Sequence, residues 1–508
     1  MCPTSNLPQD PRRRHLPPGP KGLPFIGNML DLAESDLVRH KVRRWHQTYG
    51  AIFHTKIGGT DYIWLSSPKA VKDLMDKRSS IYSSRPALPL AQDVASAGRR
   101  QLFLPYGARW RQIRRHGHAL LSAPAALRHQ PMQDAESRQL LAELLQDPPG
   151  FYHINRRYAA SVIMRSTYGR RVKRWDDDPL LREVFTVIDN LTEMTAPGAH
   201  VVDSFPALAA WPQWLLGGWR RFGERVFAHD SAVYLRLWDA LKREVEQGEA
   251  PDCFCKEFYL NDPAESGIDD LAAAYTCGGL VEAGSETTAS TLNNFVLCMT
   301  LFPEARRRAQ EEIDRVVGPE RLPAWEDEQA LPYTRALIKE VLRWRPVNKF
   351  GMVHASSEDD WYEGFFIPKG SVVVLNWWAI HMDPSIHKDP ENFDPARYLG
   401  KPLGAAEYLN VSDPYERDHF TYGAGRRVCQ GVHLAERSLY INIVRTLWGF
   451  NITKKIDSEG KEIEPDQGMV RGFLSVPNPF LTDIKVRSEK HAEVIRKSFE
   501  AAEREGLV

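Results

Sequence analysis

One cysteine of this chain lies in a segment whose residue types and spacing could bind a metal cofactor. Cys429 is flanked by Gly425 and Gly431, is preceded by Arg426 and Arg427, and is followed by a predicted helix. A cysteine binds metal as the thiolate, and nearby guanidinium groups and the N–H groups at a helix start lower the pKa of a thiol. The glycines would let the backbone pass close to a flat ring and adopt the positive φ of a tight loop. We therefore interpret Cys429 as a thiolate ligand to a large planar metal cofactor.

Two other kinds of site would use parts of the same segment. Cys429 and His433 are four residues apart and could share one helix face, but a structural zinc site has four ligands and no second Cys/His pair lies nearby. Gly423 and Gly425 could begin a dinucleotide-binding motif, but Val428 stands in the place of its third glycine. The residues present fit the thiolate ligand better than either alternative.

The segment around Cys429 resembles the haem-ligand loop of the cytochrome P450 superfamily, whose pattern is FxxGxRxCxG. The pattern falls on Tyr422, Gly425, Arg427, Cys429 and Gly431, with tyrosine in place of the usual phenylalanine. The resemblance implies haem b, iron protoporphyrin IX, with Cys429 as the axial ligand of the iron. An axial thiolate raises the electron density on the iron and favours cleavage of the O–O bond. The Tyr422 ring would pack beneath the thiolate, where its hydroxyl needs a hydrogen-bond partner.

A long helix is predicted from 266 to 302. Ser266 and Asp269 resemble a capping box, and Pro303 would end the helix. Its central run 283–288 is Ala-Gly-Ser-Glu-Thr-Thr, which is poor in helix formers and predicts a local widening or kink of the hydrogen-bond ladder. Such a defect would leave room beside a cofactor.

The run 283–288 also resembles the oxygen-activation signature of the family. By that resemblance Glu286 is the acid and Thr287 the alcohol of a proton relay to dioxygen, and Ala283 and Gly284 form the floor on which dioxygen binds. The alternative from the residues alone is a helix bend, with the Thr287 hydroxyl bonded to a carbonyl one turn earlier.

A Glu-x-x-Arg pair is predicted on the helix 333–345. Glu340 and Arg343 share one face of that helix, where such a pair is usually a solvated ion pair of little energetic consequence. The family instead buries this pair and adds an arginine from a later loop, which the resemblance places at Arg397. Two guanidinium groups on one carboxylate would then hold the scaffold behind the cysteine loop.

Haem carries two propionates, which are costly to bury without partners. Trp110 and Arg114 resemble the WxxxR helix of the family, in which the indole N–H and the guanidinium bind propionate. Arg427 is expected as a second partner and His354 as a third. Further basic residues crowd the same helix and could offer an acidic electron donor a docking face, or could be a merely solvated surface: Arg111, Arg115 and His116.

The remaining patterns predict a mainly α fold with a small β lobe. The resemblance implies the cytochrome P450 fold, with the long distal helix over the haem and the cysteine loop on the proximal side. Strands are predicted at 51–57, 62–65, 361–366 and 371–376, and helices at 67–78, 108–122, 134–147, 155–170 and 180–195.

The chain ends and the charge balance complete the expected organisation. We expect one haem-thiolate monooxygenase domain at 21–490, an N-terminal arm with a proline-rich hinge at 1–20, and a charged C-terminal tail at 491–508. No stretch reaches the roughly 18 apolar residues that a membrane helix needs. By resemblance to microsomal members, the cytoplasmic face of the endoplasmic reticulum is expected, with membrane association through a missing N-terminal anchor; the chain as given could be soluble. Its 66 basic and 66 acidic residues do not indicate nucleic-acid binding.

The predicted function is a monooxygenase that uses dioxygen and electrons from NADPH through a separate reductase, because the chain shows no flavin or nicotinamide site of its own. Two alternatives stay open: a reductant-independent isomerase or peroxygenase, and a non-catalytic haem carrier or gas sensor. A small apolar or aromatic organic substrate is expected, and the motif wording resembles filamentous-fungal members of secondary metabolism. The residues behind this substrate prediction are Leu102, Phe103, Leu104, Phe205, Phe350, Met352 and Phe473.

Overall fold

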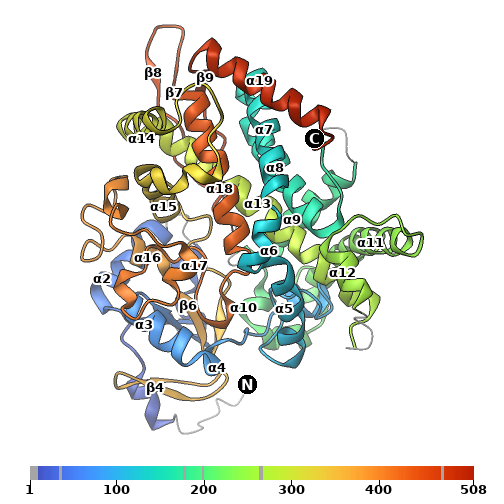
Figure 1. Ribbon diagram of the computed structural model, residues 1–508. Coiled ribbons are helices and arrows are strands. Elements are labelled where there is room, and N and C mark those ends of the chain that lie inside the picture. The colour runs from blue at the N-terminus through green and yellow to red at the C-terminus, as the bar shows by residue number, and fades with distance from the viewer. Residues whose placement is uncertain (1–9, 34–36, 176–178, 197–198, 262–266, 471–473) are drawn as a thin grey trace.

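The computed structural model describes residues 10–33, 37–175, 179–196, 199–261, 267–470 and 474–508. Helices dominate these residues, and three small sheets lie at the periphery of the helical body (Figure 1). The mainly α fold with a small β lobe is therefore confirmed. The α-helices are α1 (Met29–Ala33), α2 (Arg43–Tyr49), α3 (Pro68–Val71), α4 (Ser79–Tyr82), α5 (Ala108–Leu121), α6 (Ala123–Arg128), α7 (Gln130–Gln146), α8 (Phe151–Tyr168), α9 (Pro179–Thr195), α10 (Val201–Ser204), α11 (Trp219–Glu246), α12 (Phe254–Leu260), α13 (Asp270–Leu301), α14 (Pro303–Val316), α15 (Pro332–Trp344), α16 (Trp377–His381), α17 (Ala405–Tyr408), α18 (Val432–Gly449) and α19 (Glu489–Arg504).

The long predicted helix is α13, which is 32 residues long and buried over most of its length. Asp269 caps its start, because its carboxylate accepts a hydrogen bond from the Ala272 N–H at 2.6 Å. Pro303 opens the next helix, as expected at a helix stop. Ser266, the other residue of the predicted capping box, lies outside the described residues. At 1.5 Å per residue α13 is roughly 48 Å long, so it can support a site at mid-length and still be anchored at both ends.

The expected defect in the middle of α13 is not present. The structure assigns one uninterrupted α-helix from Asp270 to Leu301. Polar side chains of this stretch bond back to the helix instead: the Ser285 hydroxyl donates to the Val281 carbonyl at 2.8 Å, and the Thr287 hydroxyl donates to the Ala283 carbonyl at 2.7 Å. Burial against α8 and α11 compensates for the low helix propensity of these residues.

The main β lobe is a four-stranded sheet with the order β1-β2-β6-β3. The two strands predicted at 51–57 and 62–65 are β1 (Ile52–Ile57) and β2 (Thr60–Leu65), which form an antiparallel hairpin, and β6 (Val372–Leu375) joins β2 in parallel. β3 (His354–Ala355) completes the sheet beside β6. All four residues of β6 are buried, which explains its continuous apolar run.

The predicted strand at 361–366 is wrong as a single strand. It is a separate hairpin of β4 (Asp360–Tyr362) and β5 (Phe365–Ile367). Glu363 and Gly364 both have positive φ, +49° and +82°, which is the conformation of a two-residue turn between antiparallel strands. The turn reverses the chain in the middle of the aromatic run.

A third sheet, which the sequence reasoning missed, lies near the C-terminal end of the chain. It has the order β8-β7-β9, with β7 (Phe450–Ile456), β8 (Glu462–Ile463) and β9 (Thr482–Val486). Figure 1 places this sheet and α19 at the top of the view, away from the β4 hairpin at the lower left. The segment predicted as a charged tail forms most of α19, which contacts α7 and buries Ala492, Ile495 and Ala502. Among the described residues, no helix is both long enough and apolar enough to cross a membrane.

Candidate functional site

A cavity bounded by the described residues lies between the middle of α13 and the loop that carries Cys429. Its volume is about 380 Å³. Segments far apart in the sequence form its wall: the start of α5, the middle of α13, β3 and the cysteine loop. Nine of the sequence-predicted site residues line it, namely Trp110, Arg114, Ala283, Gly284, Thr287, His354, Tyr422, Arg427 and Cys429.

The Cys429 thiol is presented to this cavity by a tight loop. The Cys429 N–H donates to the Tyr422 carbonyl at 2.8 Å, and the Gly423 N–H donates to the Phe420 carbonyl at 2.8 Å, so the loop closes on itself. Cys429 is an exposed residue, and it lines the cavity. Burial raises the pKa of the thiol, while the Gly431 N–H and the Arg114 guanidinium oppose that rise.

The expected sources of thiolate stabilisation near Cys429 need one correction. Gly431 is the N-cap of α18 and contributes its N–H group as predicted. Arg426 is exposed and bonds to the Tyr106 hydroxyl, and the Arg427 guanidinium lies on backbone carbonyls. Neither arginine acts on the Cys429 thiol; Arg114 from α5 does.

Gly425 has the predicted positive φ of +65°, but for a different reason. It does not line the cavity. A Cβ atom at this position would lie 2.1 Å from the Met75 carbonyl oxygen, and the Gly425 N–H donates to the Asp76 carboxylate at 2.7 Å. The glycine is thus required by close packing against residues 75–76 rather than against a ring.

The Tyr422 hydroxyl has no hydrogen-bond partner among the described residues, although it is buried. Burial, with Glu436 and Cys429 nearby, holds the pKa of this phenol well above its ordinary value. The hydroxyl therefore stays neutral, and the hydrogen-bond partner expected for it is not found in the part of the chain that the structure describes.

Four basic side chains gather in one part of the cavity wall, which we refer to as the basic end: Arg85 and His354 are buried, and Arg114 and Arg427 are half-buried. His354, Arg114 and Arg427 are predicted site residues, and Arg85 is one that the sequence reasoning missed. Burial lowers the pKa of all four, to about 9 for Arg427 and well below the ordinary value for His354 and Arg85. Mutual repulsion lowers three of these values further, because Arg85 acts on His354, Arg427 on Arg85, and Arg114 on Arg427.

This excess of buried positive charge fits a group with anionic substituents. Without an anion, the four basic side chains would be desolvated with no counter-charge. Their existing contacts hold them in place: Arg85 donates to the carbonyls of Leu102, Met352 and Val353, and His354 Nδ1 lies 2.9 Å from the Tyr82 carbonyl oxygen. The two propionates of haem b match this charge, and the thiol at the cavity wall matches its iron.

Trp110 links two of these cations. The Arg427 guanidinium lies 4.3 Å from the centre of its ring and that of Arg114 lies 5.3 Å from it. The Arg114 Nη2 also donates to the Val428 carbonyl at 2.5 Å, and the Gln430 side chain donates to the Arg114 carbonyl at 2.8 Å. The start of α5 is therefore tied to both sides of Cys429.

The two predicted relay residues of α13 point to different surroundings. Thr287 lines the cavity. Glu286 is buried outside the cavity wall, where its carboxylate accepts hydrogen bonds from Arg156 of α8 at 3.0 Å and from Ser290 at 3.2 Å. Burial raises the pKa of Glu286, and the Arg156 guanidinium opposes this rise. Its second oxygen, Oε2, has no hydrogen-bond partner among the described residues.

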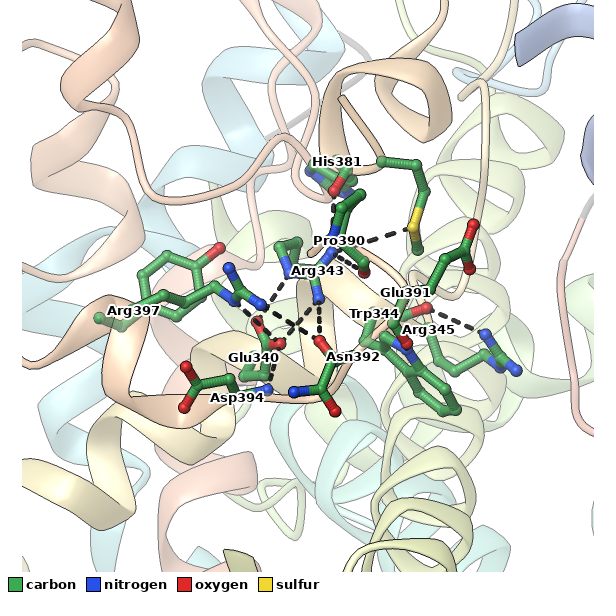
Figure 2. A network of polar contacts seen from close by, with 12 residues as sticks. Glu340, Arg343, Trp344, Arg345, His381, Pro390, Glu391, Asn392, Asp394 and Arg397 are labelled. Atoms are coloured by element: carbon green, nitrogen blue, oxygen red, sulfur yellow. Dashed lines mark hydrogen bonds and ion pairs between the residues drawn. The ribbon is translucent and has the colours of Figure 1, made fainter. Parts of the chain in front are cut away.

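Figure 2 shows the predicted buried triad around Glu340. Arg343 binds the Glu340 carboxylate through two hydrogen bonds of 2.7 Å, and the Arg397 Nε donates to the same carboxylate at 3.1 Å. Glu340 and Arg343 side chains are both 0% exposed. The Asp394 N–H adds a further hydrogen bond at 2.8 Å. Arg343 binds the carboxylate through two nitrogen atoms, Nε and Nη2, whereas Arg397 binds it through Nε alone. Contacts through two nitrogen atoms were expected from both arginines.

The triad is connected to the cysteine loop through His381 and through Leu342, the residue before Arg343. The Arg343 Nη1 donates to the His381 carbonyl at 2.8 Å, and the His381 Nε2 accepts a hydrogen bond of 2.8 Å from the Phe420 N–H. The Thr421 hydroxyl donates to the Leu342 carbonyl at 3.0 Å. Phe420 and Thr421 immediately precede Tyr422, so the triad determines where the loop begins.

The substrate-side prediction is confirmed at two of its seven residues. Leu102 and Met352 line the cavity. Phe103 and Leu104 are core residues outside the wall, Phe205 packs against the β1–β2 turn, and Phe350 packs against Trp64; Phe473 lies outside the described residues. Arg85, Arg100 and Glu282 also line the cavity. They fall in the segments 84–104 and 276–284, which are expected by resemblance to contribute to the pocket wall, but no spacing signal in the sequence marks them individually.

Within the described ranges, no cluster of three or more His, Cys, Asp or Glu residues is arranged to hold a metal ion.

Comparison with known proteins identifies the class. The family model for cytochrome P450 matches residues 17–483. Cytochrome P450 monooxygenase verL of Clonostachys rogersoniana is 47% identical over 98% of this chain and 92% of its own length. Cytochrome P450 monooxygenase virE of Hypocrea virens is 41% identical over 96% and 88%, and cytochrome P450 monooxygenase 231 of Postia placenta is 37% identical over 96% and 92%.

The chain therefore belongs to the cytochrome P450 family and is a monooxygenase. The family binds haem through a cysteine thiolate. The resemblance stated from the cysteine loop is confirmed.

The triad yields a stability prediction. Glu340→Gln removes the carboxylate that forms an ion pair with the buried Arg343, so we expect the free energy of unfolding to fall by about 3–5 kcal/mol. The measurement is urea denaturation of the two proteins followed by circular dichroism. Glu311→Gln is the matched control, because Glu311 binds Arg307 on the exposed face of α14 and its loss should leave the midpoint unchanged. Equal midpoints for both variants would contradict a structural role of the triad.

Proposed function

We propose that this chain binds haem b through the Cys429 thiolate and oxidises a small organic substrate in the cavity beneath α13. The observation that carries the proposal is the position of the Cys429 thiol, which faces a cavity that has buried cations at one end and Thr287 in its wall. Bound haem activates dioxygen, so that one oxygen atom enters the substrate and the other is reduced to water. The protein supplies the ligand, the proton path and a cavity shielded from solvent.

The basic end of the cavity would hold the haem propionates. Arg114 and Arg427 present guanidinium groups there, with the Trp110 indole between them. His354 and Arg85 extend the same cationic wall. A propionate beside His354 would favour its protonated form, because an opposite charge offsets the desolvation that lowers its pKa.

Thr287 and Glu286 would move protons from two sides of α13. The Thr287 hydroxyl is in the cavity wall beside Ala283 and Gly284. Glu286 faces α8, where the partly exposed Arg156 connects it toward solvent. The carboxylate, with its raised pKa, would take up protons on that side, and the Thr287 hydroxyl would deliver protons on the cavity side.

Electrons would come from NADPH through a separate reductase that docks on the outer face of α5. Arg111 and Arg115 are exposed and take part in no ion pair within the described part of the chain. Arg426 of the cysteine loop is exposed beside them, over the Tyr106 ring that Arg111 also contacts. An acidic reductase surface would complement these cations close to Cys429.

The substrate is proposed to be a small apolar or aromatic compound of fungal secondary metabolism. The three relatives compared above are fungal monooxygenases, and the cavity wall between the charged groups is mainly aliphatic, with Leu102, Ile163, Val347 and Leu474. The endoplasmic reticulum is the proposed location.

Exposed apolar residues support contact with a membrane surface. Phe25 is 95% exposed and Trp214 is 82% exposed, with Leu23, Trp211 and Leu215 also exposed. These residues belong to two segments, 23–30 and 201–216, which we refer to together as the apolar face. The two segments meet across the β1–β2 turn, because the Gly58 N–H donates to the Ile26 carbonyl at 3.1 Å and Gly58 also packs against the Phe205 ring.

The central test replaces the proposed ligand. Cys429→Ser should abolish the absorption band that a thiolate gives to the reduced, carbon monoxide-treated haem, together with substrate turnover.

A second test concerns the electron donor. In the native protein, NADPH consumption should require an added reductase, and the double variant Arg111→Glu, Arg115→Glu should consume NADPH more slowly while its haem spectrum stays unchanged. Turnover without reductase would favour the isomerase or peroxygenase alternative, and a normal spectrum without any turnover would favour the haem carrier. A Cys429→Ser protein with native spectrum and turnover would overturn the proposal.

The proton path predicts a pH effect. Arg156→Met removes the cation that stabilises ionised Glu286, so the carboxyl pKa rises further; because a proton donor must be protonated, the descending limb of the pH–turnover profile should move to higher pH. Arg165→Met is the control, since Arg165 also lies on α8 but binds Glu136. Glu286→Gln should remove the limb altogether. Identical profiles for all four proteins would exclude Glu286 from the path.

The apolar face predicts membrane binding by this chain. Trp211→Ser with Trp214→Ser should reduce co-sedimentation with phosphatidylcholine vesicles several-fold, because two large exposed side chains no longer leave water. Leu481→Ser, at an exposed apolar residue outside the face, should bind like the native protein. Equal sedimentation of the native protein and the double variant would contradict the assignment.

A further inference from the structure

A buried cluster of three charged side chains forms the cavity wall at Glu282. Arg100 lies before α5, Asp230 on α11 and Glu282 on α13, with side chains 1%, 0% and 8% exposed. The Arg100 Nη2 contacts the Asp230 Oδ2 and the Glu282 Oε1 at 2.6 Å each, and its Nε donates to the Glu282 Oε1 at 2.9 Å. Two carboxylates therefore share one guanidinium, which leaves a formal charge of minus one on the cluster.

The two carboxylates of this cluster differ in how many of their oxygens have polar partners. Both oxygens of Asp230 have partners, because Oδ1 accepts a hydrogen bond from Asn190 at 2.8 Å and lies 3.0 Å from the His229 Nδ1. At Glu282, both Arg100 contacts go to Oε1. Burial raises the pKa of the nearby Tyr234 phenol, and Glu282 raises it further.

Only part of the cluster faces the cavity. Arg100 and Glu282 line it, together with their neighbours Gln101 and Ala283, whereas Asp230 does not. Glu282 also directly precedes the stretch of α13 that includes Thr287. Glu282 lies five positions before Thr287, or roughly 7.5 Å along the helix axis, so a ligand of modest size could span both.

We propose that Glu282 is a specificity-determining residue that accepts a hydrogen bond from an N–H group of the substrate. The inference rests on the proposed function, because it places the substrate in the same cavity as the Cys429 thiol. A carboxylate in the cavity wall has acceptor capacity beyond Oε1, and a substrate without a donor would leave it desolvated. The cluster charge favours N–H groups with positive character, which range from a neutral amide to a protonated amine.

Matched ligand pairs test this preference in the haem-loaded protein. N-benzylacetamide and N-benzyl-N-methylacetamide differ in the N–H group. Benzyltrimethylammonium and neopentylbenzene have the same shape but differ in charge. Binding is measured by equilibrium dialysis, with the haem absorption spectrum recorded in parallel. Absence of a thiolate-haem spectrum reports on the proposed function, whereas the dialysis ratios report on Glu282.

We expect N-benzylacetamide to bind about fivefold more tightly than its methylated partner. Benzyltrimethylammonium carries no N–H group, so its pair measures the attraction of positive charge alone. Glu282→Leu should remove the amide preference, and Glu282→Gln, which keeps an oxygen acceptor, should retain it. Asp230→Asn neutralises the cluster but leaves Glu282 in the cavity wall, so it should retain the amide ratio. Equal binding of the two amides by the native protein, a preference for the cation without one for the N–H amide, or an unchanged preference in Glu282→Leu would overturn the proposal.

Discussion

The Glu340 carboxylate, buried with two guanidinium groups, is the interaction on which the position of the cysteine loop depends. A carboxylate removed from water is stable only when its lone pairs are satisfied, and here Arg343, Arg397 and the Asp394 N–H satisfy them. The remaining donors of Arg343 bind the carbonyls of His381 and Pro390. The ion pair therefore fixes α15 against residues 381–397 as well as pairing charges.

The position of α15 in turn affects the position of Cys429, because short connections join them. Both His381 and the end of α15 bind the backbone or side chains of residues 420–421, and the loop from there to Cys429 closes on the Tyr422 carbonyl. On its other side the loop is held by Arg114 and by the hydrogen bond from Gln430 to α5. Gly425 packs where no Cβ would fit. A thiol supported from both sides keeps one orientation toward the cavity, which a metal ligand requires.

Features encoded in short motifs could be predicted from the sequence, because their residues are close together and their partners are dictated by charge. The triad, the Trp110 helix and the cysteine loop belong to this group. Features that depend on how distant segments meet could not. Arg85 enters the basic end only because carbonyls of residues 102, 352 and 353 orient it. Helix periodicity places Glu286 on α13 but does not tell whether it faces the cavity or α8. The turn at Glu363 was missed since only the following glycine is a conventional turn residue.

Two groups of charged side chains in the cavity wall have opposite signs, and this difference acts on the haem and the substrate in different ways. At the basic end, two propionates would neutralise cations whose pKa values are lowered by burial and by mutual repulsion. In the cluster at Glu282, Arg100 neutralises only one of the two carboxylates, and no part of haem b carries a positive substituent to complete the pairing. Haem binding would therefore neutralise the basic end and leave the negative charge beside Glu282. Because the side chains of this cluster are buried, that remaining charge acts more strongly over a few ångströms than it would in water, so it would orient a substrate donor toward Glu282.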